Sequence, residues 1–183
     1  MSRPWFPKRY ADLAARGRVP AGFAVLAACL WLAEPTRASL LAGLPLMLAG
    51  LALRAWSAGH LAKNRRLATS GPYAYLRNPL YVGTVMIAAG LALASRQWPA
   101  AALLAAFFLL VYLPVIEQEE QHLRKLFPQY EAYARTTPRF LPRVRKAASS
   151  GHFSWELFWR NREYQAVLGW LAGLLVLIGK IRA

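Results

Sequence analysis

Five apolar runs dominate this 183-residue chain and constrain what it can fold into. They cover residues 19–33, 39–61, 80–94, 98–116 and 166–178. A membrane-spanning helix needs about 20 mostly apolar residues. The second and fourth runs meet that length, and the others need flanking residues or a thin or tilted path to span. Periodicity alone does not separate a short spanning helix from a buried soluble one. The whole chain is 57% hydrophobic, however, and a soluble fold that had to bury five such runs would have almost no polar surface left.

We therefore predict an all-α, multi-pass integral membrane bundle of about five transmembrane helices, forming a single domain over residues 1–183. The chain carries 23 Lys and Arg against 8 Asp and Glu. These cations cluster in residues 3–18, 63–77 and 124–162, whereas the hairpins at 34–37 and 95–97 hold only Arg37 and Arg96. The positive-inside rule then predicts a cell (inner) membrane protein with a cytoplasmic N-terminus. Lys180 and Arg182 violate this pattern unless the last helix lies in the interface or ends short of the far side. Neither nucleic-acid binding nor a metal site is expected, because the basic segments carry no recognised binding motif.

The chain divides into an interfacial segment (1–18), a core (40–143) and a C-terminal helical extension (150–183). We predict that the first two membrane helices form a tight antiparallel pair. Phe127 and Pro128 are expected to separate two short helices after the fourth run. Ser149, Ser150 and Gly151 suggest a linker, and Ser154 is suited to cap one continuous last helix.

Two polar clusters are predicted to meet at one membrane depth. Glu117, Glu119 and Glu120 lie where the fourth helix leaves the bilayer, and Arg77 and Asn78 precede the third helix. Adjacent residues cannot share a helical face, so Glu119 and Glu120 should have different surroundings. The acidic run alone fits an ordinary polar helix end better than a site. Arg77, Asn78 and Tyr81 at the same level favour a site, under a cover of Tyr73 and Tyr75.

The start of the third helix suits an anion. Pro79 fits the first helical turn, where its missing N–H costs nothing, and it holds Asn78 extended. The free N–H groups of the helix terminus are then available to a carboxylate. Gly83 and Gly90 lie seven residues apart, on roughly one face. They either open a slot for a flat ligand or allow close helix packing.

Three ionisable residues have open roles. Arg54 lies inside the second apolar run, where it is functional, extends to the interface or pairs with a carboxylate. His60 and His122 are either ordinary interfacial side chains or proton acceptors for a reaction.

The segments "GPYAYLRNPLYVG" (71–83) and "EEQHLRKLFPQYEAYARTTPRFLP" (119–142) flank the hairpin of the third and fourth helices. Together, in this order, they resemble the membrane methyltransferases related to isoprenylcysteine carboxyl methyltransferase and phospholipid N-methyltransferase. The family pattern reads G-P-Y-x-x-x-R-[HN]-P-x-Y-x-G, then E-E-x-x-L-x-x-x-F-x-x-Y-x-x-Y. The resemblance covers about residues 40–143.

The resemblance implies that S-adenosylmethionine binds on the cytoplasmic side, leaving S-adenosylhomocysteine as product. Tyr130 and Tyr133 would help a cytoplasmic segment cover the cofactor. The cofactor-binding residues implied are Tyr75, Arg77, Asn78, Tyr81, Gly83, Glu119 and Glu120. The catalytic candidates are Glu120, His60 and Arg54.

The methyl acceptor is expected to be a lipophilic molecule or lipid from the bilayer, with a carboxylate, amine, phenol or thiol as the accepting group. The prenylcysteine enzymes resemble one another in an arginine five residues before the last glutamate, where this chain has Val115. Carboxyl methylation of a prenylated cysteine is therefore in doubt. The alternative from another class is a non-catalytic membrane protein, either a transporter subunit or a lipid-binding scaffold. The oligomeric state stays open.

Overall fold

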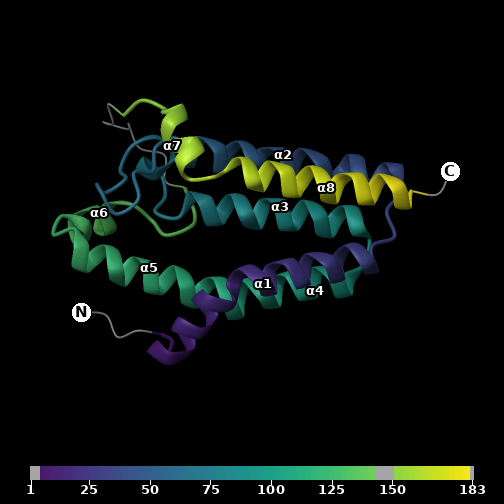
Figure 1. Cartoon of the computed structure of the whole chain (residues 1–183), viewed down its shortest axis with the longest axis horizontal. Coiled ribbons are helices and arrows are strands. Elements are labelled where there is room, and N and C mark those ends of the chain that lie inside the picture. Colours follow the sequence, from purple (N-terminus) through teal and green to yellow (C-terminus); the bar gives the residue numbers. More distant parts are fainter. Residues whose placement is uncertain (1–4, 143–150, 182–183) are drawn as a thin grey trace.

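The computed structural model describes residues 5–142 and 151–181, and within these ranges it is all-helical, without strands. The helices follow one another along the chain as shown in Figure 1. Their bounds are α1 Lys8–Leu32, α2 Arg37–Ala58, α3 Pro79–Ser95, α4 Trp98–Phe107, α5 Leu113–Leu126, α6 Tyr130–Thr136, α7 Trp155–Arg160 and α8 Tyr164–Lys180. A 3-10 turn, η1 (Gly71–Ala74), precedes α3. The predicted linker at Ser149 and Ser150 and the charge of Arg182 lie outside the described residues.

Three helical stretches are long and apolar enough to cross a membrane: Lys8–Leu32, Arg37–Ala58 and Trp98–Leu126. The shorter apolar helices α3 and α8 have 17 residues each. The predicted helical membrane bundle is confirmed. The first span is longer than its apolar run, because residues 8–18 form the first turns of α1. Figure 1 shows this N-terminal part of α1 turning away from the rest of the bundle, and Pro20 lies inside the helix.

The helices form two layers, with α2, α3 and α8 in one and α1, α4 and α5 in the other (Figure 1). The prediction that the first two membrane helices form a tight pair is wrong, because α2 packs most closely on α3. Glycines explain this choice. Gly43 faces the backbone oxygen of Gly90, and a Cβ on Gly50 would lie 2.6 Å from the backbone oxygen of Gly83. Backbones that approach this closely leave no room for side chains at the interface.

The fourth membrane helix continues without interruption from α4 into α5. A five-residue π-helical stretch, η2 (Phe108–Tyr112), joins them just before Pro114. Such a stretch is one way in which a helix accommodates a residue that lacks a backbone N–H. The helix ends at Leu126, and α6 begins at Tyr130. The break predicted at Phe127 and Pro128 is confirmed, and it turns α6 back toward η1.

The C-terminal extension forms two helices instead of the predicted single helix. Ser154 caps α7, since its Oγ accepts the backbone N–H of Leu157 at 3.3 Å. Arg162 then adopts a left-handed conformation (φ 55°), which ends α7 and starts α8 in a new direction. At 1.5 Å per residue, α8 is about 25 Å long.

The far end of α8 is fixed to the C-terminus of α1. Lys180 Nζ donates to the carbonyl oxygens of Leu30 (2.9 Å) and Trp31 (2.7 Å). A cation suits the C-terminal end of a helix, where carbonyl groups lack intrahelical partners. The last helix therefore extends along the bundle to the end of α1.

Candidate functional site

A buried carboxylate organises the end of the bundle that carries α6. Glu120 is only 1% exposed. Asn78 Nδ2 donates to its Oε1 at 2.9 Å, and Arg139 donates to both carboxylate oxygens at 3.1 and 2.8 Å. Arg77 Nη1 adds a longer contact of 3.4 Å. The predicted meeting of the two polar clusters is confirmed, with Glu120 as its centre.

Local backbone geometry brings these groups together. Asn78 is the N-cap of α3, and with φ −123° and ψ 53° its backbone is neither helical nor in the extended conformation that was predicted. The backbone N–H of Arg77 donates to the carbonyl oxygen of Pro138 at 2.9 Å, which places the segment after α6 beside the start of α3. Arg139 follows directly, and its hydrogen bonds to Glu120 raise the pKa of its guanidinium. Sequence reasoning did not select Arg139, although it lies in the stretch at 119–142 that carries the family resemblance.

One large cavity of about 1240 Å³ runs from this end of the bundle into its interior. Its polar arm is lined by side chains from α1, η1, α3, α5 and α6 and from the loop after α2. The polar arm includes Arg18, Lys63, Asn64, Arg66, Tyr73, Arg77, Asn78, Tyr81, Glu119, His122, Tyr130 and Tyr133, and Arg160 and Arg162 also line the cavity just before α8. Its apolar arm comprises Leu26, Met47, Leu91, Leu104, Ala166, Gly169, Trp170, Gly173, Leu174 and Leu177.

Glu119 and Glu120 have different surroundings, as predicted. Glu119 lines the polar arm and accepts a hydrogen bond from Arg18 Nη1 at 3.1 Å, a contact that ties α1 to α5. Its side chain remains 43% exposed. The Glu120 carboxylate lies behind the cavity wall, where it is fully used in holding Arg77, Asn78 and Arg139.

Tyrosines line the polar arm, and two of its residues carry buried donors without a partner among the described residues. The hydroxyl of Tyr133 donates to the carbonyl oxygen of Tyr73 at 2.7 Å, which ties α6 to η1. Tyr130 is 1% exposed, yet its hydroxyl has no hydrogen-bond partner among the described residues. Burial raises the pKa of this hydroxyl, so it stays protonated and can donate. Arg77 Nε is likewise buried without a partner there. Such groups cost free energy unless a ligand or water completes them.

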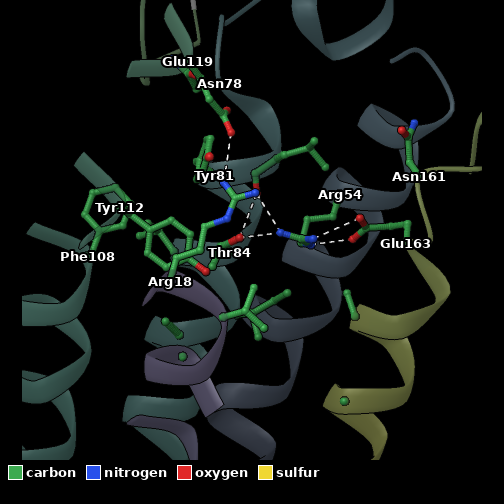
Figure 2. Close-up of a pocket in the computed structure, with 18 of the residues that line it drawn as sticks. Arg18, Arg54, Asn78, Tyr81, Thr84, Phe108, Tyr112, Glu119, Asn161 and Glu163 are labelled. Atoms are coloured by element: carbon green, nitrogen blue, oxygen red, sulfur yellow. Dashed lines mark hydrogen bonds and ion pairs between the residues drawn. The ribbon is translucent and has the colours of Figure 1, made fainter. Parts of the chain in front are cut away.

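A further ion pair, between Arg54 and Glu163, lines the cavity (Figure 2). Arg54 Nε and Nη2 donate to the two carboxylate oxygens of Glu163 at 2.6 and 3.0 Å. Arg54 Nη1 donates to Thr84 Oγ1 at 2.6 Å and to the carbonyl oxygen of Leu80 at 3.3 Å. Of the roles left open for Arg54, the structure shows pairing with a carboxylate. Both residues line the cavity, and Glu163 was not selected from the sequence.

Three predicted site residues lie elsewhere. Gly83 is buried against Gly50 and Arg54, so its missing side chain serves packing of α2 on α3 instead of opening a slot. His60 and Tyr75 line a separate pocket of about 370 Å³. His60 is buried with its Nδ1 3.0 Å from Ser70 Oγ, and burial lowers its pKa. The η1 turn carries Tyr75 to this side, away from the cavity.

The comparisons with known proteins give the class. The phospholipid methyltransferase family model matches residues 38–130, which covers α2 through the start of α6. The chain therefore belongs to the phospholipid methyltransferase family. This segment contains Arg77, Asn78, Glu119 and Glu120, whereas Arg139 and the C-terminal extension lie beyond it.

Two curated relatives are named as metal resistance proteins. The cobalt-zinc-cadmium resistance protein CzcN of Cupriavidus metallidurans is 36% identical over 131 residues, covering 68% of this chain and 58% of that protein. The nickel-cobalt-cadmium resistance protein NccN of Alcaligenes xylosoxydans xylosoxydans is 40% identical over 93 residues, covering 50% of this chain and 44% of that protein. The chain thus spans about half the length of these relatives. No solved structure matches it.

Proposed function

We propose that the protein transfers a methyl group from S-adenosylmethionine to a lipophilic acceptor inside the bundle. The observation that carries this proposal is the single cavity whose polar arm continues into an apolar arm between the membrane helices. Its volume of about 1240 Å³ exceeds the roughly 300–1,000 Å³ typical of a site for one small ligand. Two reactants, one polar and one apolar, fit such a cavity.

The polar arm suits the cofactor. Tyr73, Tyr81 and Tyr133 offer faces against which adenine can pack. The unpartnered donors Tyr130 Oη and Arg77 Nε suit the carboxylate of the amino-acid end. Glu119 is the available carboxylate for hydroxyl or ammonium donors, because Glu120 is fully engaged. We assign Glu120 a positioning role in place of the catalytic one first considered.

Methyl transfer requires few further catalytic groups from the protein. When bound, S-adenosylmethionine supplies a methyl group on an already activated sulfonium, so alignment and exclusion of water are the main requirements. An acceptor that must lose a proton needs a base in reach. Among the cavity-lining groups of the described residues, the Glu119 carboxylate and the His122 ring nitrogen that does not donate to Asn64 Oδ1 can take that proton. His60 lies in the other pocket and drops out of this role.

The alternative remains a non-catalytic membrane protein, and the names of the curated relatives give it a specific form: a part in metal resistance. Within residues 5–142 and 151–181, no group of three or more His, Cys, Asp or Glu side chains is placed to hold a metal ion. The methyltransferase proposal rests on the family and on the cavity, and it is compatible with resistance as the physiological outcome.

Labelled cofactor tests activity and sidedness together. Membrane vesicles containing the protein are incubated with S-adenosylmethionine carrying a tritiated methyl group, and the lipid extract is counted. We propose that the basic end of the bundle faces the cytoplasm. Label should therefore enter lipid in inside-out vesicles and fall to background in right-side-out vesicles, because the charged cofactor does not cross the bilayer. Vesicles without the protein are the control. Absence of protein-dependent label in both orientations would contradict the proposed function, and label confined to right-side-out vesicles would reverse the sidedness.

A further inference from the structure

Helix α8 has two different faces. Leu168, Leu171 and Leu175 are 59%, 42% and 68% exposed on the surface of the bundle, where an apolar side chain fits a lipid environment. The other face lines the cavity through positions 166, 169, 170, 173, 174 and 177. These positions recur at the three- and four-residue spacing of one helical stripe. The cavity face therefore belongs to the fold and is distinct from the lipid face.

The cavity face of α8 combines open space with one unused polar group. A Cβ placed on Gly169 would meet no atom within 4 Å, and one placed on Gly173 would meet only Leu30 Cδ1 at 4.0 Å. Trp170 lies between the two glycines and lines the same cavity. Its indole Nε1 is buried without a hydrogen-bond partner among the described residues. A buried N–H without a partner is unfavourable, so an oxygen supplied by a ligand would stabilise it.

Within the described residues, the positions of α8 that line the cavity carry no charged side chain. The apolar arm is lined by aliphatic and aromatic side chains, with Arg54 and Glu163 at its boundary. The carboxylate of Glu163 neutralises the Arg54 guanidinium through two hydrogen bonds, so this pair offers no free charge to an ionised group of a ligand. The other cavity-lining cations near α8, Arg160 and Arg162, lie before the helix begins. Burying an isolated carboxylate or ammonium beside α8 would be far more costly than burying a neutral group.

The helix is also fixed in place at both ends. Arg54 and Glu163 join its first turn to α2, and Lys180 joins its last turn to α1. Just before α8, Asn161 Nδ2 donates to the carbonyl oxygens of Ala58 (2.9 Å) and Leu61 (2.8 Å), at the C-terminus of α2. A wall held at three points can select a ligand by shape.

We propose that the cavity face of α8 is the acceptor-binding wall, with Gly169, Trp170 and Gly173 as its specificity-determining residues. It takes an apolar molecule that carries a neutral oxygen able to accept a hydrogen bond from Trp170, such as a carbonyl or phenol oxygen. This inference rests on the proposed function. It narrows the methyl acceptor from the four classes first considered to molecules that carry a neutral oxygen. It also gives a role to α8, which lies outside the family match at residues 38–130.

Photoaffinity labelling tests the assignment. Four diazirine probes with the same alkyl tail, ending in a phenol, a carboxylate, an ammonium or no polar group, are crosslinked to the protein in detergent and mapped by peptide mass spectrometry. We expect the phenol probe to label the cavity face of α8, and about tenfold more than either charged probe. Trp170→Phe should reduce labelling by the phenol probe about three- to tenfold and leave the tail-only probe unchanged.

Gly173→Leu tests whether filling the open space on the cavity face blocks binding of the probe, and Gly179→Leu is its matched control. Gly179 lies on the same helix, also has nothing within 4 Å and does not line the cavity. Leucine favours helix more than glycine, so neither variant endangers folding of α8. Gly173→Leu should lower labelling of the cavity face at least about tenfold, and Gly179→Leu should not.

Equal labelling of the cavity face and of Leu168 and Leu175, or equal behaviour of the two glycine variants, would overturn the α8 assignment. S-adenosylhomocysteine binding is measured on the same samples. If Gly173→Leu binds it normally and labelling is unaffected, this inference fails while the proposed function stands. If the parent protein does not bind it, the proposed function fails, and the identification of the labelled wall as an acceptor site falls with it.

Discussion

Glu120→Ala is expected to destabilise the protein and to weaken cofactor binding. The substitution leaves Arg77 and Arg139 without their shared carboxylate at a site where Glu120 is 1% exposed. Removing one partner of a buried ion pair costs about 3–5 kcal/mol, and the partial exposure of the two arginines places the expected loss near the lower value. The free energy of unfolding is measured by SDS titration in mixed micelles. Affinity for S-adenosylhomocysteine, measured by calorimetry under native conditions, should fall more than about tenfold.

Glu131→Ala is the matched control. Glu131 also pairs with an arginine, Arg124, at 3.0 Å, but its side chain is 61% exposed on α6. An exposed pair contributes about 0–1 kcal/mol, so this variant should retain both stability and binding. If Glu120→Ala proved as stable and as tight-binding as Glu131→Ala, the carboxylate would not be the organiser of the site.

Arg54→Met should lower the free energy of unfolding by about 3–5 kcal/mol, because it leaves the Glu163 carboxylate, 7% exposed, without its cation. Glu163→Met should have a similar cost through the unpaired Arg54. The double variant with methionine at both positions should recover most of the loss, since a buried pair can often be replaced by apolar residues at little cost. Unfolding in mixed micelles measures all three. A double variant no more stable than either single variant would show that the pair does not fix α8 to α2.

The same double variant distinguishes a structural role of Arg54 from a direct role in the reaction. If Arg54 only fixes α8 in place, restored stability should bring restored methyl transfer, measured with tritiated cofactor. A stable double variant without activity would instead assign Arg54 a direct part in the reaction.

Local sequence patterns predicted the parts of this structure that depend on neighbouring residues. Apolar length predicted the membrane helices, Pro128 predicted the break before α6, and Pro79 predicted the start of α3 with Asn78 before it. The meeting of Asn78 with Glu120 was also predictable, because the hairpin between their helices returns the chain to the same depth.

Contacts between distant segments escaped prediction. Arg54 and Glu163 are 109 residues apart, and no local pattern joins them. The pairing of α2 with α3 depended on glycines that fit one another across an interface, Gly50 against Gly83 and Gly43 against Gly90. Taken singly, Gly83 fitted a ligand slot as well as a packing contact. Only the partner helix decides between them, and the partner is a property of the whole fold.

Titration with S-adenosylhomocysteine tests the central claim most directly. The purified protein in detergent is titrated by calorimetry, alongside Glu119→Gln, which removes the charge of the carboxylate that lines the polar arm and leaves the Glu120 cluster intact. The account predicts saturable binding at one site per chain, weakened about tenfold in Glu119→Gln without loss of stability. No saturable binding to the parent protein, or equal affinity in the variant, would contradict it.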